Sequence, residues 1–469
     1  MADICIIYAR KDATAIPSAL EAVLSPDWTV WWDGHIVDGD YRAAIETAIR
    51  ACHILVPIWS GEATLNAHMH DELRIAANAG ASIMPLRIHE ADAPMGYGSL
   101  QATAVLGWMG EPDRPELKVF RDLVRKAIEK RTPNIRPKTI SLTRDIDLPG
   151  FFYSVSSHET RLEPAAALRA LDMFGVPSLL VSAYDTGPDA PAGIRTALEK
   201  RRDAGAVVLL DSGNYERARK GDKSWTFARY RAALKVTPHD AAFSFDTLNP
   251  RGGVDKIADA AIRAARRTAD HTGAPIIPIV HLPRRADGDY EVELAGPLMR
   301  RVAQALRPAM IAIPERELGS GVFARARAMD RIRHALKGIG WYQPVHVLGA
   351  GNPIGLALLS AAGADCFDGL EWCRYAVDGE QAQLHHFQLF EMFEYQLAVA
   401  DSAVAAAAAT LEGVSYTTRT VMHNLDFYET WLKQLRTALR DEKQLVTFMS
   451  QLLPKGAMKQ AHDALPEIL

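Results

Sequence analysis

The sequence contains few cysteines and no long apolar run, and both features limit what the protein can be. Four of its 469 residues are cysteine, too few for a disulfide framework and consistent with a reducing compartment. No apolar run approaches the roughly 20 residues needed to cross a bilayer. Residues 1–12 also lack the apolar core of a signal peptide. We therefore expect a cytoplasmic protein with no membrane partner.

An excess of charge of either sign is lacking as well. Lysine and arginine number 53, aspartate and glutamate number 57, and the formal net charge is -4. Such a chain has no general attraction to nucleic acid, so any contact of that kind needs a local basic patch. A Walker-type phosphate loop is also absent. What the chain does have is a 48% hydrophobic content over a length that allows two or three domains.

Residues 1–131 alternate short apolar runs with amphipathic segments. The expected strands are Ile4–Tyr8, Trp28–Trp32, His53–Trp59 and Ser82–Ile88. The expected helices are Asp12–Leu24, Tyr41–Ala51, Asp71–Ala79 and Pro115–Lys130. Alternation of this kind predicts an α/β domain with a flavodoxin-like, doubly wound sheet.

Short motifs in this first unit resemble those of bacterial TIR domains. They are Ile6-Ile7-Tyr8-Ala9-Arg10-Lys11-Asp12, Val30-Trp31-Trp32-Asp33 with Gly39 after it, Ala48-Ile49, Asp71-Glu72-Leu73 and Gly107-Trp108-Met109-Gly110. The resemblance implies that Glu72 is the catalytic residue of a site that cleaves NAD+ as its substrate. The residues it assigns to NAD+ binding are Tyr8, Arg10, Trp32 and Asp33. It also implies self-association through TIR domains.

A single carboxylate suits NAD+ cleavage. Nicotinamide leaves as a neutral molecule and needs no proton, whereas the oxocarbenium-like ribose is stabilised by a nearby carboxylate. The sequence departs from the family at His68, where a tryptophan usually lies four residues before the glutamate. The alternative is that Glu72 is a solvated helix acid beside Arg74 and that the domain is an adaptor.

A stretch with three prolines and no clear periodicity follows the first unit. We expect residues 132–150 to be a linker and residues 151–469 to be a second domain. A helical pattern fills the C-terminal part of that domain, from residue 378 to residue 469.

Apolar runs in the second domain end in polar residues or glycine. The runs and their followers are Val207–Leu210 with Asp211, Phe243–Phe245 with Asp246, Ile276–Val280 with His281, Val345–Leu348 with Gly349, and Ala364–Phe367 with Asp368. Helical patterns between them include Ala192–Arg202, Lys256–Arg267 and Pro353–Ala362. Such alternation over about 250 residues predicts a TIM-type β/α barrel with its chemistry at the strand carboxyl ends. The competing interpretation is that each acid only caps the next helix.

The strand ends resemble the signature of tRNA-guanine transglycosylases. The motifs are Gly349-Ala350-Gly351, Cys366-Phe367-Asp368, Arg374 six residues later, and Asp211-Ser212-Gly213-Asn214-Tyr215. The resemblance covers about residues 150–445 and implies that Asp368 is the nucleophile and Asp211 the acid/base. The residues it assigns to the substrate are Tyr215, Asp246, His281, Gly349, Gly351 and Arg374. Among these, Asp246 and His281 would read a purine and Tyr215 would stack on it.

Two carboxylates suit the displacement of guanine, which is a poor leaving group. One attacks the anomeric carbon while the other protonates the base, as in a retaining glycosidase with carboxylates about 5 to 6 Å apart. Two departures from the family matter. No cysteine follows Cys373, so a thiolate-rich zinc site is excluded, and we expect no zinc although His423 matches a distant ligand. Ile313–Ser320 and His281 replace a glycine-lined stretch and a glutamine, so the ligand could be another base, nucleoside or nucleic acid.

A basic segment follows Asp211 closely. Residues 216–235 carry seven basic and two acidic side chains, with Trp225, Phe227 and Tyr230 interleaved. This composition suits phosphate contact and base stacking. The alternative is an amphipathic surface helix whose aromatic residues face the core.

Three functions remain open from the sequence. We prefer a TIR NAD+ hydrolase or cyclase coupled to a barrel that senses or modifies a nucleic-acid-derived ligand, which by resemblance to bacterial TIR fusions suggests antiphage or stress defence. The second is base exchange on tRNA or DNA by Asp211 and Asp368, with the TIR domain as an interaction module. The third is a non-catalytic TIR scaffold, against which the retained acids argue.

Overall fold

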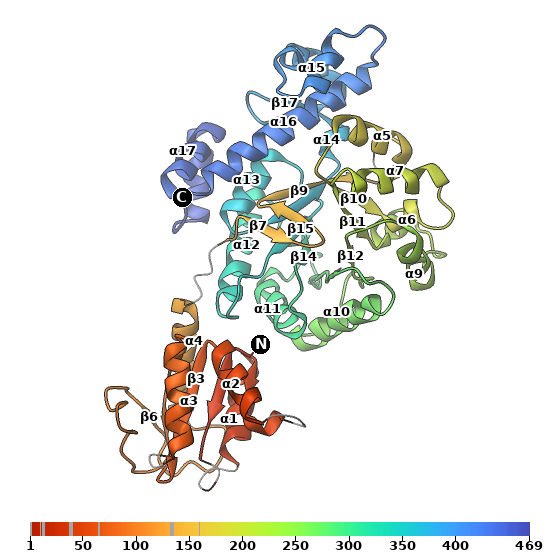
Figure 1. Ribbon diagram of the computed structural model, residues 1–469. Coiled ribbons are helices and arrows are strands. Elements are labelled where there is room, and N and C mark those ends of the chain that lie inside the picture. Colours follow the sequence, from red (N-terminus) through yellow and green to blue (C-terminus); the bar gives the residue numbers. More distant parts are fainter. Residues whose placement is uncertain are drawn as a thin grey trace. The chain divides into compact units, whose positions relative to one another are not determined.

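Figure 1 shows the computed structural model, which describes residues 2–9, 11, 15–36, 41–63, 66–131, 136–158 and 160–469. The chain divides into two units, the first formed by residues 1–135 with 337–342 and the second by the remaining residues. Each unit is considered by itself. Within the described ranges, none of the helices combines the length and apolar character needed to cross a membrane.

The first unit is a parallel sheet with helices on both faces. Its strand order is β2-β1-β3-β5-β6, with β4 also paired to β3, and every pairing is parallel. The strands are β1 (Ile4–Ile7), β2 (Val30–Trp31), β3 (Ile54–Trp59), β4 (Ser82–Ile83), β5 (Leu86–Arg87) and β6 (Thr103–Ala104). The helices are α1 (Ile16–Leu24), the 3₁₀ helix η1 (Asp33–His35), α2 (Tyr41–Ala51), α3 (Ala67–Asn78) and α4 (Pro115–Arg131).

Alternate residues of β1 enter two different apolar clusters. Ile4 and Ile6 pack with residues of α1 and α4, whereas Cys5 and Ile7 pack with residues of α2 and α3. This alternation is what a strand buried on both faces requires. The flavodoxin-like prediction is therefore confirmed. The strand expected at 82–88 is split into β4 and β5 because Pro85 has no N–H to donate to the ladder.

Eight parallel strands form a nearly closed barrel in the second unit, as predicted. They follow one another around the ring from β9 to β16, β16 pairs with β9, and a bridge between Ile279 and Ala312 joins the two ends of the sheet. The strands are β9 (Gly150–Val155), β10 (Ser178–Ser182), β11 (Val207–Asp211), β12 (Ala241–Phe243), β13 (Ile276–Ile277), β14 (Ile311–Pro314), β15 (Val345–Leu348) and β16 (Cys366–Gly369).

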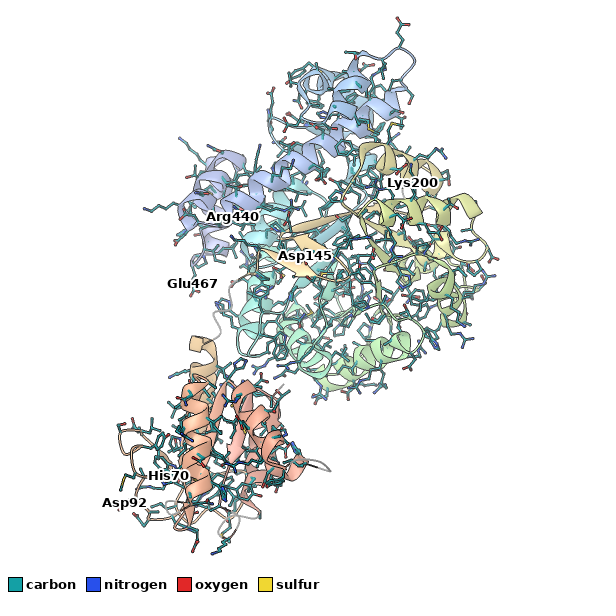
Figure 2. The ribbon with its side chains drawn as sticks, viewed as in Figure 1. His70, Asp92, Asp145, Lys200, Arg440 and Glu467 are labelled. Carbon is teal, nitrogen blue, oxygen red and sulfur yellow. The ribbon has the colours of Figure 1, made fainter. Side chains whose placement is uncertain are left out.

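Helices connect these strands. They are α5 (Pro164–Phe174), α6 (Ala183–Thr186), α7 (Ala192–Asp203), α8 (Asn214–Lys220), α9 (Phe227–Val236), α10 (Val254–Ala269), η3 (Val292–Leu294), α11 (Ala295–Leu306), η4 (Glu315–Leu318), α12 (Val322–Lys337) and α13 (Pro353–Ala361). Figure 2 shows Lys200 on the outward face of α7, where it pairs with Asp172 of α5.

An antiparallel hairpin lies in the stretch expected to be a linker. It consists of β7 (Thr139–Ser141) and β8 (Asp145–Asp147), with Asp145 labelled in Figure 2. Its buried Ile140 and Ile146 pack in one cluster with residues at the amino ends of the barrel strands, such as Val207 and Cys366. The hairpin therefore covers the end of the barrel opposite the strand carboxyl ends. Residues 132–135 of the expected linker lie outside the described residues.

The C-terminal region is mainly helical, as expected. After α14 (Glu371–Arg374) come the hairpin β17 (Tyr375–Asp378) and β18 (Gln383–His386), the 3₁₀ helices η5 (Phe387–Met392) and η6 (Glu394–Val399), and helices α15 (Ala403–Thr410), α16 (Tyr416–Ala438), α17 (Glu442–Leu452) and α18 (Lys455–Ala464).

Helix α16 holds the loops that follow β15 and β16. The Asn424 amide donates to the carbonyls of Trp372 and Tyr375 at 2.9 and 2.7 Å, and the Tyr428 hydroxyl donates to the Gly351 carbonyl at 2.6 Å. Buried side chains of α16 thus hold both loops through hydrogen bonds to their backbone carbonyls.

Candidate active sites

A cavity of about 750 Å³ lies at the carboxyl end of the sheet in the first unit. Its walls come from the end of β1, the segment after β2, and helices α2 and α3. Three of the residues assigned to NAD+ chemistry, Tyr8, Asp33 and Glu72, line it. Arg10, another of the five assigned residues, lies outside the described residues.

Glu72 occupies an environment that favours its protonated form. Burial raises the pKa of Glu72 to about 7, and the charges of Asp33 and Asp71 contribute in the same direction. Arg74 pairs with Asp71 at 3.2 Å. The Tyr41 hydroxyl donates a hydrogen bond to Asp33. The site therefore concentrates acidic groups around one partly desolvated carboxyl, an arrangement that a cationic substrate would stabilise.

Trp32, also assigned to NAD+ binding, is not among the residues that line this cavity. The Trp32 Nε1 atom donates to Glu21 of α1 at 2.8 Å, and the ring packs against the cluster formed by α1 and α4. The neighbouring Trp31 lines the cavity instead. Successive residues of an extended segment point to opposite faces, so this one-residue difference moves the indole across the sheet.

A second cavity, of about 330 Å³, lies at the carboxyl ends of the barrel strands. The predicted site residues that line it are Asp211, Tyr215, Asp246, His281, Gly349, Asp368 and Arg374. Gly351 lies behind this surface, where an added Cβ would collide with the carboxylate of Glu371. The barrel thus brings together strand ends that are up to 157 residues apart, since Asp211 ends β11 and Asp368 lies in β16.

Three donors fix the orientation of the Asp368 carboxylate. Its Oδ2 accepts from the Ser154 hydroxyl at 2.9 Å. Its Oδ1 lies 2.9 Å from His346 Nε2 and 3.2 Å from the Gly349 backbone nitrogen. His346 is fully buried, with its ring against those of Phe152 and Phe243. The carboxylate is therefore held by rigid groups of the barrel interior, as a nucleophile should be.

Asp211 is the complementary, protonated carboxyl. Burial raises the pKa of Asp211 to about 8, the charge of Glu216 adds to the rise, and the Gly213 N–H that donates to its Oδ2 at 3.0 Å opposes it. The charges of Asp246 and Asp368 act in the same direction as Glu216. At neutral pH the protonated form of Asp211 is therefore favoured, and a carboxyl group in that form can serve as a general acid.

Asp246 and His281, assigned to purine reading, are bonded to each other. His281 Nε2 lies 2.6 Å from Asp246, and its Nδ1 lies 2.8 Å from Glu317. Burial alone would lower the pKa of His281, but the two carboxylates raise it to about 10. His281 is thus an imidazolium held between two buried acids. Asp246 also accepts from Ser212 and Asn214, so it is oriented from three sides.

Sequence reasoning missed Glu317 and Glu371. Glu317 is 2% exposed and also accepts a hydrogen bond from the Leu282 N–H at 2.7 Å. It could have been noticed because it lies in Ile313–Ser320, the stretch that differs from the family pattern. Glu371 lines the barrel cavity from the first residue of α14, and burial raises its pKa to about 7. An acid three residues after the predicted nucleophile was the signal for Glu371.

Two aromatic residues of the basic segment lie in the core, whereas Tyr215, which directly precedes the segment, lines the cavity. Trp225 and Tyr230 are buried, and they donate to the carbonyls of Ser212 and Phe243 at 3.0 and 2.6 Å. They are therefore core residues and do not form a stacking surface. Tyr215 lines the cavity, with the guanidinium groups of Arg219 and Arg316 at 5.1 and 5.3 Å from its ring centre.

In the part of the chain that the structure describes, no group of three or more histidine, cysteine, aspartate or glutamate side chains is arranged to hold a metal ion. His423 is buried, with Nε2 at 2.8 Å from the Val377 carbonyl, and burial lowers its pKa.

Comparisons with known proteins agree with both halves of this description. Residues 4–118 match the family model of the TIR domain. The tRNA-guanine(15) transglycosylase of Haloferax volcanii is 23% identical over 259 residues, which are 53% of this chain and 48% of that protein. The chain therefore spans about half the length of this relative. Together with the folds, these matches show that the protein joins an N-terminal TIR domain to a β/α barrel similar to that of a tRNA-guanine transglycosylase.

Proposed function

We propose that the barrel exchanges the base of a nucleotide in tRNA or DNA through a covalent glycosyl intermediate. The observation that carries this proposal is the presence in one cavity of an oriented Asp368 and a protonated Asp211. The named activity of the Haloferax volcanii relative supports the same reaction class.

The two carboxyl groups divide the reaction between them. A carboxylate oxygen of Asp368 attacks C1′ of the target nucleotide, the C1′–N bond breaks, and Asp211 gives its proton to the departing nitrogen. An incoming base then attacks C1′, the ester bond to Asp368 breaks, and Asp211 takes the proton of the incoming nitrogen. Two displacements at one carbon retain its configuration. Atoms and charge balance without a further reactant.

Incorporation of labelled guanine into tRNA or DNA tests this proposal. We expect the full chain to incorporate label and the Asp368→Asn and Asp211→Asn variants to lose at least about a hundredfold in rate, since each removes one half of the acid–nucleophile pair. Asp145→Asn, in the exposed β7–β8 hairpin, is the matched control. Equal incorporation by Asp368→Asn, or none by the wild-type chain into either nucleic acid, would contradict the proposal.

We infer a second activity, NAD+ cleavage by the TIR domain. It is supported by the 750 Å³ cavity in which Glu72 faces the acids Asp33 and Asp71. The bond between nicotinamide and ribose breaks, and nicotinamide leaves as a neutral molecule with the bonding electron pair. Water or a hydroxyl group then adds to the ribose and releases one proton to solvent. The Glu72 carboxylate stabilises the cationic ribose.

Nicotinamide release is the direct assay for this activity. Glu72→Gln should abolish it, whereas Asp122→Asn on α4, on the other face of the sheet, should leave it unchanged. A specific activity that rises with protein concentration would support self-association of TIR domains. Release that persists in Glu72→Gln would exclude the assigned role.

We propose further that the barrel controls the TIR domain in a defence response to phage or stress. The reactions proposed for the two domains both break an N-glycosidic bond. This common chemistry supports the proposal that the two activities are regulated together. Nicotinamide release should then rise on addition of tRNA or DNA, and Glu72→Gln should remove protection of cells challenged with phage. If neither tRNA nor DNA changes the rate of nicotinamide release, the barrel does not control the TIR domain in this way.

A further inference from the structure

Glu216 is a second acid next to the acid/base residue Asp211 in the wall of the barrel cavity. Asp211 ends β11, and Glu216 lies in the first turn of α8, the helix that follows this strand. Burial raises the pKa of Glu216, and hydrogen bonds from the Ser156 and Ser182 hydroxyls oppose the rise. Among the charged groups around Asp211, Glu216 contributes most to its raised pKa. Loss of the Asp211 proton therefore leaves two interacting negative charges in a buried place, which favours the uptake of another proton.

The two oxygens of Glu216 have different surroundings. The Oε1 atom accepts a hydrogen bond from the Ser156 hydroxyl at 2.7 Å. The residue is only 4% exposed, and its buried Oε2 atom makes no hydrogen bond of normal geometry to any residue that the structure describes. Because an unsatisfied buried acceptor is costly, Oε2 points to a donor from outside the chain.

Asn214, the first residue of the same helix, presents a second acceptor of this kind. Its Nδ2 donates to both the carbonyl and the carboxylate of Asp246, which fixes the orientation of the amide. Its Oδ1 atom is buried without a hydrogen-bond partner in the described ranges, and the residue is 2% exposed. Asn214 and Glu216 line the same cavity. Two such acceptors in one helical turn suit a small molecule with two donors, and water commonly satisfies buried polar groups in this way.

Base exchange alone does not require a second acid at this place. In that reaction the incoming base returns a proton to Asp211, so one acid/base carboxyl is sufficient. A pair of interacting buried carboxyls, of which one is protonated and one ionised, resembles the pair in aspartic proteases, which hydrolyse their substrates. The arrangement therefore favours a reaction in which water takes part.

We propose that the barrel also hydrolyses the glycosyl intermediate, with Glu216 as the catalytic residue that activates water, and thereby removes a base from nucleic acid. This proposal rests on the proposed base exchange for the formation of the intermediate on Asp368. It differs from base exchange in the second half of the reaction, where water replaces the incoming base.

The hydrolytic step balances with one molecule of water. After the base has left with the proton of Asp211, the water oxygen attacks C1′ from the face that the base occupied, and Glu216 takes a proton from the water. The bond between C1′ and Asp368 breaks, and its electron pair returns to the carboxylate. Transfer of the proton from Glu216 to Asp211 restores the starting state. The products are the free base and a nucleic acid with a hydroxyl group at C1′ in place of the base.

Release of base in the absence of free base tests the proposal. The full chain is incubated with tRNA or DNA labelled in its guanine bases, and the released label and the aldehyde-reactive abasic sites are both counted. We expect release over many turnovers, with one abasic site for each base released, and no release by Asp368→Asn. Release that stops at one base per protein molecule, or that leaves no abasic sites, would overturn the proposal.

Glu216→Gln separates hydrolysis from exchange. An amide cannot take a proton from water, whereas an incoming base still returns its proton to Asp211. With unlabelled guanine added, we expect the ratio of abasic sites to exchanged bases to fall at least about tenfold in this variant. The exposed Glu199→Gln is the matched control and should keep the wild-type ratio. An unchanged ratio in Glu216→Gln would exclude the assigned role.

A second variant guards against misfolding of the first. Ser156→Ala removes the hydrogen bond to Oε1 of Glu216 and keeps its charge, so it should lower the same ratio to a smaller extent. If Glu216→Gln does not fold, an unchanged ratio in Ser156→Ala would overturn the proposal.

The outcomes also separate this proposal from base exchange itself. Abasic sites without incorporation of free guanine would refute base exchange and keep hydrolysis. Incorporation without abasic sites would refute hydrolysis and keep base exchange. The absence of both products with tRNA and with DNA would overturn both proposals.

Discussion

His346 Nε2 lies 2.9 Å from Oδ1 of Asp368, in the fully buried interior of the barrel. Because a carboxylate accepts, the imidazole proton is on Nε2, and Nδ1 has no hydrogen-bond partner in the described chain. The rings of Phe152 and Phe243 hold the imidazole from its sides. His346 therefore positions Asp368, the proposed nucleophile, and it is not among the residues that line the cavity.

Loss of this hydrogen bond should reduce turnover without weakening binding. We expect His346→Leu to lower kcat of base exchange by roughly tenfold to a hundredfold, with KM little changed, because the carboxylate loses one of its three fixed donors. His346→Gln, which keeps an N–H donor, should restore part of the rate. A change confined to KM would contradict the positioning role.

The rate of base exchange should fall at alkaline pH. Asp211 must be protonated to act, and its pKa is about 8, so kcat/KM should decrease above that value. Glu216 is the charge that contributes most to the raised pKa of Asp211. Glu216→Gln should therefore move the falling limb to lower pH, whereas Glu199→Gln on the exposed side of α7 should not. A limb that stays in place in Glu216→Gln would argue against Asp211 as the acid.

Stability should depend on the charge of His281. The folded-state pKa of about 10 exceeds the usual value of about 6.5, so the folded chain binds more protons, and stability is lost as pH rises from about 6.5 to 10. His281→Ala should cost about 3 to 5 kcal/mol at pH 7, because it leaves Asp246 and Glu317 buried without their cation. Urea unfolding from pH 6 to 10 measures both effects. Two results would contradict a charged His281 between Asp246 and Glu317. The first is a wild-type free energy of unfolding that does not fall over this pH range, and the second is a pH dependence that is unchanged in His281→Ala.

NAD+ cleavage should rise with pH around neutrality. The ionised form of Glu72 stabilises the ribose cation, and its pKa is about 7. Asp71 raises that pKa, so Asp71→Asn should move the rising limb of kcat/KM to lower pH. Nicotinamide release from pH 5.5 to 8.5 measures the shift. A limb that stays in place in Asp71→Asn would show that the charge of Asp71 is not felt at Glu72.

The polar residues at the strand ends could be predicted from the sequence, because each one directly follows the apolar run that forms its strand. The pattern predicts Asp211, Asp246, His281 and Asp368 at strand ends without knowledge of the fold. The nearly closed ring of strands then brings these four residues together in one cavity.

Contacts between distant strands could not be predicted in that way. His346 lies within β15 and looks like any other strand residue in the sequence. The register pairs it with Cys366, and only its side chain reaches Asp368, two residues further along β16. Glu317 reaches His281 across 36 residues. The strands of the β7–β8 hairpin are three residues long, too short for a periodic pattern. Trp32 shows the remaining difficulty, since a shift of one residue changes the face of a strand.

Detection of a covalent intermediate on Asp368 would test base exchange by the barrel most directly. The full chain is incubated with tRNA or DNA without added base, denatured, digested, and analysed by mass spectrometry for a nucleotide attached to a peptide. We expect an adduct on the peptide that contains Asp368, absent in Asp368→Asn and removed when guanine is added before denaturation. Base exchange with an adduct on another residue, or with none, would contradict it.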